Sequence, residues 1–265
     1  MESAADTTLN DRQIDILRIL NRRERVTVAE LTDRLRVSEV TVRKELSRLA
    51  DAGRLVRVHG GARLAEEPEE SRTVFRRRES NLEAKRDIGR AAAELVREGE
   101  TIFLDSGSTV EELARLVADM EVRVVTNSIE VVSLLGGSRA SVTCIGGGYR
   151  AEAGSFVGPL AVRTVREFFF DRCFLGATGI TFDGTCSAQN VLEGEVKRAA
   201  IDQSTSRVVL ADSSKLGNVA FSVFARAPEI SLFVVESSPE AEKLADVERV
   251  TSGDKREVLI AGRKR

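Results

Sequence analysis

The chain has 265 residues, more than one small domain needs and enough for one small plus one medium-sized domain. Hydrophobic residues make up 42%, which permits a substantial core and excludes wholesale disorder. The formal charge is -2 but uneven: residues 1–63 carry 13 Lys/Arg against 10 Asp/Glu and the remainder carries 27 against 32, so any contact with a polyanion is expected near the N-terminus.

The first part of the chain follows the order helix, helix, turn, helix, hairpin. Apolar residues recur at helical spacing over 11–22, 27–35 and 39–52. Thr27 and Glu30 form a capping-box pattern before the second helix, and Ser38 is placed to cap the third. An alternating strand over 55–58 then turns at two glycines. This order is typical of a winged helix-turn-helix, which we assign to residues 10–65.

The third predicted helix has two different faces. Val42, Leu46 and Leu49 form an apolar side that must pack on the first two helices. The opposite side and the hairpin offer cations, hydroxyls and methyl groups that suit base edges in the major groove and backbone phosphates. A basic helix face alone is more often solvated surface, but its place in a capped helix-turn-helix favours DNA binding. The candidate DNA-binding residues are Ser38, Val40, Thr41, Arg43, Lys44, Ser47, Arg48, Arg57 and His59.

Beyond residue 65 the pattern changes. Residues 66–75 contain Pro68 and lack periodicity, which predicts a linker. Strands are then predicted at 101–104, 122–126, 140–145, 172–177, 207–211 and 231–235, and helices at 84–97, 110–117, up to Leu135 and at 191–203. Such alternation is typical of a mostly parallel sheet covered on both faces. The predicted fold class is α/β: a winged helix-turn-helix domain, then a doubly wound, mostly parallel sheet over 76–260.

Polar turns follow four of the predicted strands. The Ser106–Thr109 turn leads directly into a helix, whose N-terminal N–H groups and dipole suit a phosphate, although it is not a P-loop. After a later strand, Lys215 offers a positive charge and Asp212 can orient hydroxyls. Each turn alone is more often a helix cap or a surface loop, but together they predict a ligand at the carboxyl ends of the strands. The candidate effector-binding residues are Asp105, Ser106, Gly107, Ser108, Thr109, Asn127, Gly147, Asp212 and Lys215.

These motifs resemble the DeoR family of transcription regulators. Residues 16–62, with TVRKEL at 41–46, resemble its helix-turn-helix, although Lys44 stands where the family usually has arginine. The segments LDSGST, VVTNS, GGG, GPLA, EGEVKRAAI and LADSSKLG follow the order of its sensor domain, which is similar in fold to ribose-5-phosphate isomerase. The resemblance spans about Asn10 to Leu259. It implies a repressor of carbohydrate genes whose partners are a double-stranded DNA operator, a phosphorylated sugar effector and further copies of itself, as a homo-oligomer (dimer or tetramer).

The main alternative is a sugar-phosphate isomerase fused to a DNA-binding domain. Isomerisation needs a carboxylate base, for which Glu193 and Glu195 are the candidates. The related isomerases carry an acidic Asp-Gly-Ala-Asp turn, whereas the corresponding region here, residues 178–184, reads TGITFDG, and His59 is the single histidine. A purely structural module would not explain four polar turns. We therefore expect no catalytic residues.

The remaining sequence features concern location and metals. The first residues, MESAADTTLNDRQ, lack the apolar core of a signal peptide, and no apolar run approaches the roughly 20 residues of a membrane span. Cys144, Cys173 and Cys186 are isolated and odd in number, which favours small apolar roles in a reducing compartment. We expect a cytoplasmic protein with no membrane contact, no metal site and no cofactor.

Overall fold

The computed structural model describes residues 11–21, 26–51, 55–58, 60–64, 77–78, 80–250 and 257–261. The chain divides into two compact units, Met1–Glu69 and Glu70–Arg265, here called the N-terminal and C-terminal units. The predicted linker at 66–75 lies outside the described residues. Among the helices that are described, none is long and apolar enough to cross a membrane.

The N-terminal unit is a winged helix-turn-helix, as predicted. Its elements in chain order are α1 (Asp11–Asn21), β1 (Val26–Thr27), α2 (Val28–Leu35), α3 (Glu39–Asp51), β2 (Leu55–Val58) and β3 (Gly61–Leu64). The capping box is present, since the Thr27 hydroxyl accepts from the backbone N–H of Glu30 and the Glu30 carboxylate accepts from the N–H of Thr27 at 2.8 Å. The α3 residues predicted to face inward, Val42, Leu46 and Leu49, are at most 1% exposed. The short strand β1, which pairs with β3, was not predicted.

The C-terminal unit contains a fully parallel sheet of seven described strands, which confirms the predicted α/β class. In spatial order they are β15 (Glu257–Ala261), β14 (Leu232–Glu236), β12 (Ser204–Leu210), β9 (Phe170–Gly176), β4 (Thr101–Leu104), β5 (Arg123–Thr126) and β6 (Ser141–Cys144). The edge strand β15 was not predicted, and β9 and β12 begin earlier than predicted. At the starts of β9 and β12, the pairing of Phe170 with Ser204 extends both strands beyond the apolar pattern that predicted them.

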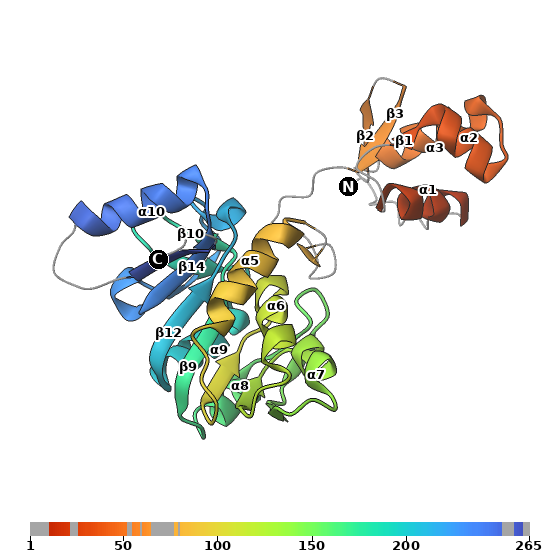
Figure 1. The fold of residues 1–265 in the computed structure, drawn as a ribbon. Coiled ribbons are helices and arrows are strands. Elements are labelled where there is room, and N and C mark those ends of the chain that lie inside the picture. The colour runs from red at the N-terminus through yellow and green to blue at the C-terminus, as the bar shows by residue number, and fades with distance from the viewer. Residues whose placement is uncertain are drawn as a thin grey trace, which may run out of the picture. The chain divides into compact units, whose positions relative to one another are not determined.

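Helices cover both faces of this sheet. Ile102 and Leu104 of β4 pack into one apolar cluster with the helices α5 (Leu82–Ala93), α6 (Ser108–Val117) and α7 (Ile129–Leu135). Phe103, between them, joins the opposite cluster with α8 (Pro159–Val165), α9 (Val191–Asp202) and α10 (Pro239–Val250). Side chains alternate between faces along a strand, so a strand buried on both sides is apolar throughout. Figure 1 shows α5 and α6 packed side by side.

Smaller elements at the edges of the unit were not predicted. They are the hairpin of β7 (Gly148–Arg150) and β8 (Ser155–Val157) and a second sheet of β10 (Gly179–Ile180), β11 (Cys186–Ala188) and β13 (Ser222–Ala225). The cores also hold two cysteines, and burial raises the pKa of the Cys173 and Cys186 thiols to about 12. At such a pKa both remain neutral thiols in the folded protein at neutral pH.

The chain reverses its direction across the sheet after β6. From β4 it first adds β5 and β6 on one side, and then returns to place β9, β12, β14 and β15 on the other side of β4. In open α/β sheets such a reversal leaves a crevice outside the carboxyl ends of the two central strands, where ligands bind. The topology therefore predicts a ligand site at the turns that follow β4 and β9.

Candidate functional site

A cavity lies at this reversal, formed by the turns that follow β4, β9 and β12. Its empty space of about 570 Å³ includes open solvent. Six of the nine candidate effector-binding residues line it: Ser106, Gly107, Ser108, Thr109, Asp212 and Lys215. The strand order thus brings together two polar turns that are about a hundred residues apart in sequence.

The turn after β4 presents the start of α6 to this cavity. Gly107 precedes the helix with φ +141°, a conformation that L side chains rarely adopt, and no heavy atom lies within 4 Å of the position that a Cβ would occupy. The backbone is therefore open to close approach by a ligand. Ser108 and Thr109, both buried, follow in the first turn of α6. The first N–H groups of a helix have no partner within the helix and carry a partial positive charge, which suits an anion.

Charged side chains around the cavity are mostly positive. Among the described residues that line it, four are cationic and two are carboxylates; they are Arg77, Lys85, Lys197 and Lys215 against Glu193 and Asp212. Even after the buried carboxylate of Asp105 is included, positive charge remains in excess. The arrangement favours an anionic ligand.

Asp105 does not line the cavity but bonds to Gly176 and Lys197, which do. It is fully buried, and its Oδ2 accepts from the N–H of Gly176 at 3.0 Å and pairs with Nζ of Lys197. Lys197 also donates to the carbonyl of Gly176 at 3.0 Å. The pair thereby joins the end of β4, the end of β9 and helix α9.

The second polar turn follows β12. Oδ1 of Asp212 accepts from Nδ2 of Asn81 at 2.9 Å and from the N–H of Ser214 at 3.2 Å. Its Oδ2 has no hydrogen-bond partner among the described residues, so this buried oxygen is left for a hydroxyl donor. Lys215, in the 3-10 turn Ser213–Lys215, is 7% exposed and faces the same cavity.

Two candidate residues lie elsewhere. The carbonyl of Asn127 accepts from the N–H of Phe156 at 2.8 Å, next to β8. Gly147 has φ +144°, and a Cβ there would lie 2.6 Å from the carbonyl oxygen of Val157. Both therefore meet the hairpin of β7 and β8, and neither belongs to the described lining of the cavity.

Some lining residues were not among the sequence candidates. Arg77, Lys85 and Lys197 reach the cavity from the segment before α5, from α5 and from α9. Lys197 lies inside the motif EGEVKRAAI, and Arg77 belongs to the arginine run at 76–78. Both were visible in the sequence, but the sequence did not indicate that they lie at the cavity. Only the packing of these segments onto the strand ends reveals them.

Neither of the two candidate bases for isomerisation, Glu193 and Glu195, offers an unpaired carboxylate in the cavity. Glu193 lines the cavity, but Nε of Arg150 donates to its Oε1 at 3.1 Å. Glu195 is exposed and is not part of the described lining. In the turn after β10, hydrogen bonds from Thr181 and from the backbone N–H of Thr185 lower the pKa of Asp183.

The candidate DNA-binding face lies on α3 and the hairpin. Val40 is 76% exposed, and Lys44 is exposed and makes no ion pair within the described parts of the chain. Nη2 of Arg43 pairs with Glu39 at 3.2 Å. Such an exposed ion pair is weak and can be exchanged for a phosphate.

Other candidates on this face have contacts inside the protein. Nη1 of Arg57 donates to Oγ of Ser47 at 2.7 Å and to the carbonyl of Arg43 at 3.3 Å, which ties the hairpin to α3. The Ser38 hydroxyl accepts from the N–H of Thr41 at 3.2 Å as the cap of α3. His59 lies outside the described residues.

One further residue anchors α3 and was not a candidate. Glu45 is 5% exposed and accepts from Nε2 of Gln13 at 2.8 Å, while Arg48 and Arg12 lie 3.7 and 3.8 Å from its carboxylate. Glu45 thus joins α1 to α3 and partly neutralises Arg48.

Known proteins share both units. Residues 12–68 match the DeoR-like helix-turn-helix domain, and residues 80–237 match the DeoR C terminal sensor domain. The chain is 32% identical to the uncharacterized HTH-type transcriptional regulator YulB of Bacillus subtilis, over 86% of this chain and 88% of that one. It is 33% identical to the transcriptional repressor AccR of Agrobacterium fabrum, over 86% and 89%. It is 29% identical to the lactose phosphotransferase system repressor of Streptococcus mutans, over 91% and 97%.

Solved structures that resemble the chain include ribose 5-phosphate isomerase A of Methanocaldococcus jannaschii. The identity is 20% and the TM-score is 0.39, over 52% of this chain and 55% of that one. A likeness of this size does not extend to activity.

Proposed function

Because the chain belongs to the DeoR family of helix-turn-helix transcription regulators, we propose that it represses genes of carbohydrate metabolism and that a phosphorylated sugar in the cavity controls its binding to operator DNA. In this proposal residues 10–65 bind double-stranded DNA and residues 76–260 bind the effector and assemble the oligomer. As a regulator of DNA, it is expected to act in the cytoplasm.

The observation that carries the effector proposal is the composition of the cavity. A phosphate placed at the Ser106–Thr109 turn meets backbone N–H groups, three hydroxyls and the positive end of α6, with Lys215 supplying a full charge. The unpartnered oxygen of Asp212 supports recognition of a sugar hydroxyl. Thr178 on the β9 side of the cavity adds a further hydroxyl. The cavity thus offers donors that suit a dianion and oxygens that suit a polyol.

We favour regulation over isomerisation. A general base must reach the proton that it removes. Of the two candidates, Glu193 lies at the cavity, and it is already paired with Arg150. Pairing with a guanidinium stabilises the charged carboxylate and makes it a poorer base. Binding without turnover is what a sensor requires.

The first experiment is a thermal-shift screen with matched pairs of ligands. Glucose 6-phosphate, fructose 1-phosphate, fructose 6-phosphate and ribose 5-phosphate are each compared with the unphosphorylated sugar. We expect at least one phosphorylated sugar to raise the unfolding temperature while its free sugar does not, because only the phosphate engages the α6 turn and Lys215. Equal shifts for both members of every pair would refute the phosphate site.

Calorimetry on two lysine variants then tests the assignment of Lys215. Lys215→Ala removes one charge-assisted hydrogen bond, so the dissociation constant of the stabilising sugar phosphate should rise roughly tenfold to a hundredfold. Lys243→Ala is the matched control, because Lys243 is exposed on α10 and outside the cavity lining. Operator binding without effector should be the same in both variants. An unchanged dissociation constant in Lys215→Ala would remove this residue from the site.

A further inference from the structure

Four residues just before α5 form a segment that contacts side chains lining the cavity. We call Arg77, Arg78, Ser80 and Asn81 the leading segment. It is the first part of the C-terminal unit that the structure describes, and in sequence it lies between the N-terminal unit and α5. It is therefore the described part of the C-terminal unit that lies nearest in sequence to the DNA-binding residues.

Residues that line the cavity also hold the backbone of the leading segment. The carbonyl of Arg77 accepts from Nζ of Lys85, and Oγ of Ser108 donates to it at 3.4 Å. Lys85 is 2% exposed and donates to a second carbonyl of the segment at 2.5 Å. At the other end, Nδ2 of Asn81 donates to Oδ1 of Asp212 at 2.9 Å. Lys85, Ser108 and Asp212 all line the cavity, so ligand and segment share the same side chains.

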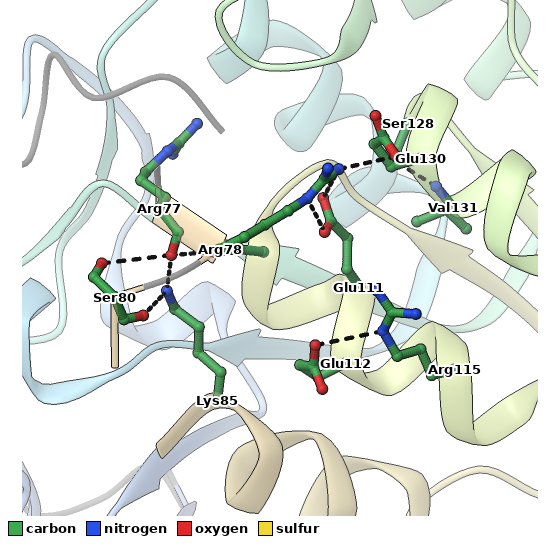
Figure 2. A network of polar contacts seen from close by, with 11 residues as sticks. Arg77, Arg78, Ser80, Lys85, Glu111, Glu112, Arg115, Ser128, Glu130 and Val131 are labelled. Atoms are coloured by element: carbon green, nitrogen blue, oxygen red, sulfur yellow. Dashed lines mark hydrogen bonds and ion pairs between the residues drawn. The ribbon is translucent and has the colours of Figure 1, made fainter. Parts of the chain in front are cut away.

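Arg78 anchors the segment to the helix that begins at the cavity. Its Nε and Nη2 donate to the two oxygens of Glu111 at 2.6 and 3.0 Å, and Nη2 also lies 3.0 Å from Oε2 of Glu130. Glu111 is 2% exposed, so this bidentate pair is largely shielded from water. Figure 2 shows the Arg78 guanidinium between the two carboxylates, whereas the Arg77 guanidinium points away from them. Arg77 is among the residues that line the cavity.

We propose that Arg77 binds the anion in the cavity and that Arg78 positions Arg77 by anchoring the leading segment. An occupied cavity then holds this segment in place. The proposal rests on the proposed function, because it takes a phosphate at the Ser106–Thr109 turn as its starting point. A phosphate there would lie beside Ser108, whose hydroxyl donates to the backbone carbonyl of Arg77. In this proposal the Arg77 side chain adds a charge-assisted hydrogen bond to the phosphate. Occupancy then shifts the segment toward its ordered state, and this shift is passed along the chain toward the N-terminal unit.

The test is amide hydrogen exchange of the full chain, read by mass spectrometry. The probe is millimolar inorganic phosphate, compared with sodium chloride at equal ionic strength. We expect phosphate to slow exchange about tenfold both in peptides over 77–85 and in peptides over 106–110, because local opening of either region would release the anion.

Three variants separate the roles. Arg77→Ala should weaken phosphate binding about tenfold, the loss of one charge-assisted bond, and Arg77→Lys should restore part of it. Arg78→Met/Glu111→Gln removes the anchor without leaving a buried carboxylate unpaired, and should abolish protection over 77–85 while 106–110 stays protected. Arg115→Ala is the control, because it breaks a partly exposed ion pair with Glu112 on the same helix, at 3.5 Å, and should change neither region (Figure 2).

The possible outcomes are distinct. Protection of 106–110 without protection of 77–85 would overturn this inference and leave the proposed phosphate site standing. Protection of neither region would count against the phosphate site itself. Equal protection of 77–85 in the wild type and in the anchor variant would show that Arg78 does not position the segment, and full phosphate affinity in Arg77→Ala would remove Arg77 from the site.

Discussion

Asp105 and Lys197 form a buried pair at the cavity, which Lys197 lines and Asp105 does not. Both side chains are at most 7% exposed, and each also bonds to the backbone of Gly176. Taking two charges from water is costly, and the cost is recovered only while both partners remain. Arg198 and Glu229 form a comparable pair in which each side chain is over a third exposed. Burial, rather than the count of ion pairs, decides what each pair contributes to stability.

At this scale we predict that Lys197→Met lowers the free energy of unfolding of the C-terminal unit by about 3–5 kcal/mol, because Asp105 is left charged and buried. Arg198→Ala should cost at most about 1 kcal/mol, since solvent screens its pair. Urea unfolding measures both. The double variant Asp105→Asn/Lys197→Met should be more stable than Lys197→Met alone, and a loss below 1 kcal/mol in Lys197→Met would contradict the argument.

At the scale of elements, α3 and its hairpin act together. Arg57 of β2 donates to Ser47 of α3, so the hairpin is fixed against the helix that carries Lys44. Arg43 and Arg48 each have a carboxylate nearby on the same helix. Lys44 has none among the described residues, so it offers the charge most readily exchanged with a DNA phosphate.

We therefore predict that Lys44→Ala weakens binding to DNA selected from a random pool and lowers the slope of log K against log salt by about one unit. Fluorescence anisotropy across a salt series measures the slope. Arg90→Ala, an exposed cation on α5 in the other unit, is the control and should leave the slope unchanged. The same slope in Lys44→Ala and wild type would exclude a phosphate contact at Lys44.

For the whole molecule, exposed apolar side chains gather near one edge of the C-terminal unit. Val219, Phe221 and Val223 lie on or just before β13, an edge strand of the small sheet, and Phe221 is 79% exposed. One recognition helix reads only a few base pairs, so two half-sites held at a fixed spacing are expected. We infer that copies of the chain associate through this edge.

Light scattering at micromolar concentration should show an oligomer for the wild type and a smaller species for Phe221→Glu. The charge would be buried against an apolar partner, which disfavours association. Phe169→Glu is the control, because Phe169 is 85% exposed but lies just before β9 in the main sheet, away from β13 in sequence and sheet. A monomeric wild type, with and without DNA, would refute the oligomer; equal mass for both variants would move the interface elsewhere.

The sequence by itself determined the local features: the capping box at Thr27, the inward face of α3, the alternation of strands and helices from β4 to β6, and the two polar turns at Ser106 and Lys215. These depend on interactions between residues a few positions apart, which leave a readable pattern. Only the tertiary structure decided which turns meet. Lys197 reaches Asp105 from 92 residues away because β9 pairs with β4, whereas Asn127 and Gly147 follow strands on the other side of β4 and meet the β7–β8 hairpin. Strand order arises from burying all apolar faces at once, and no local pattern encodes it.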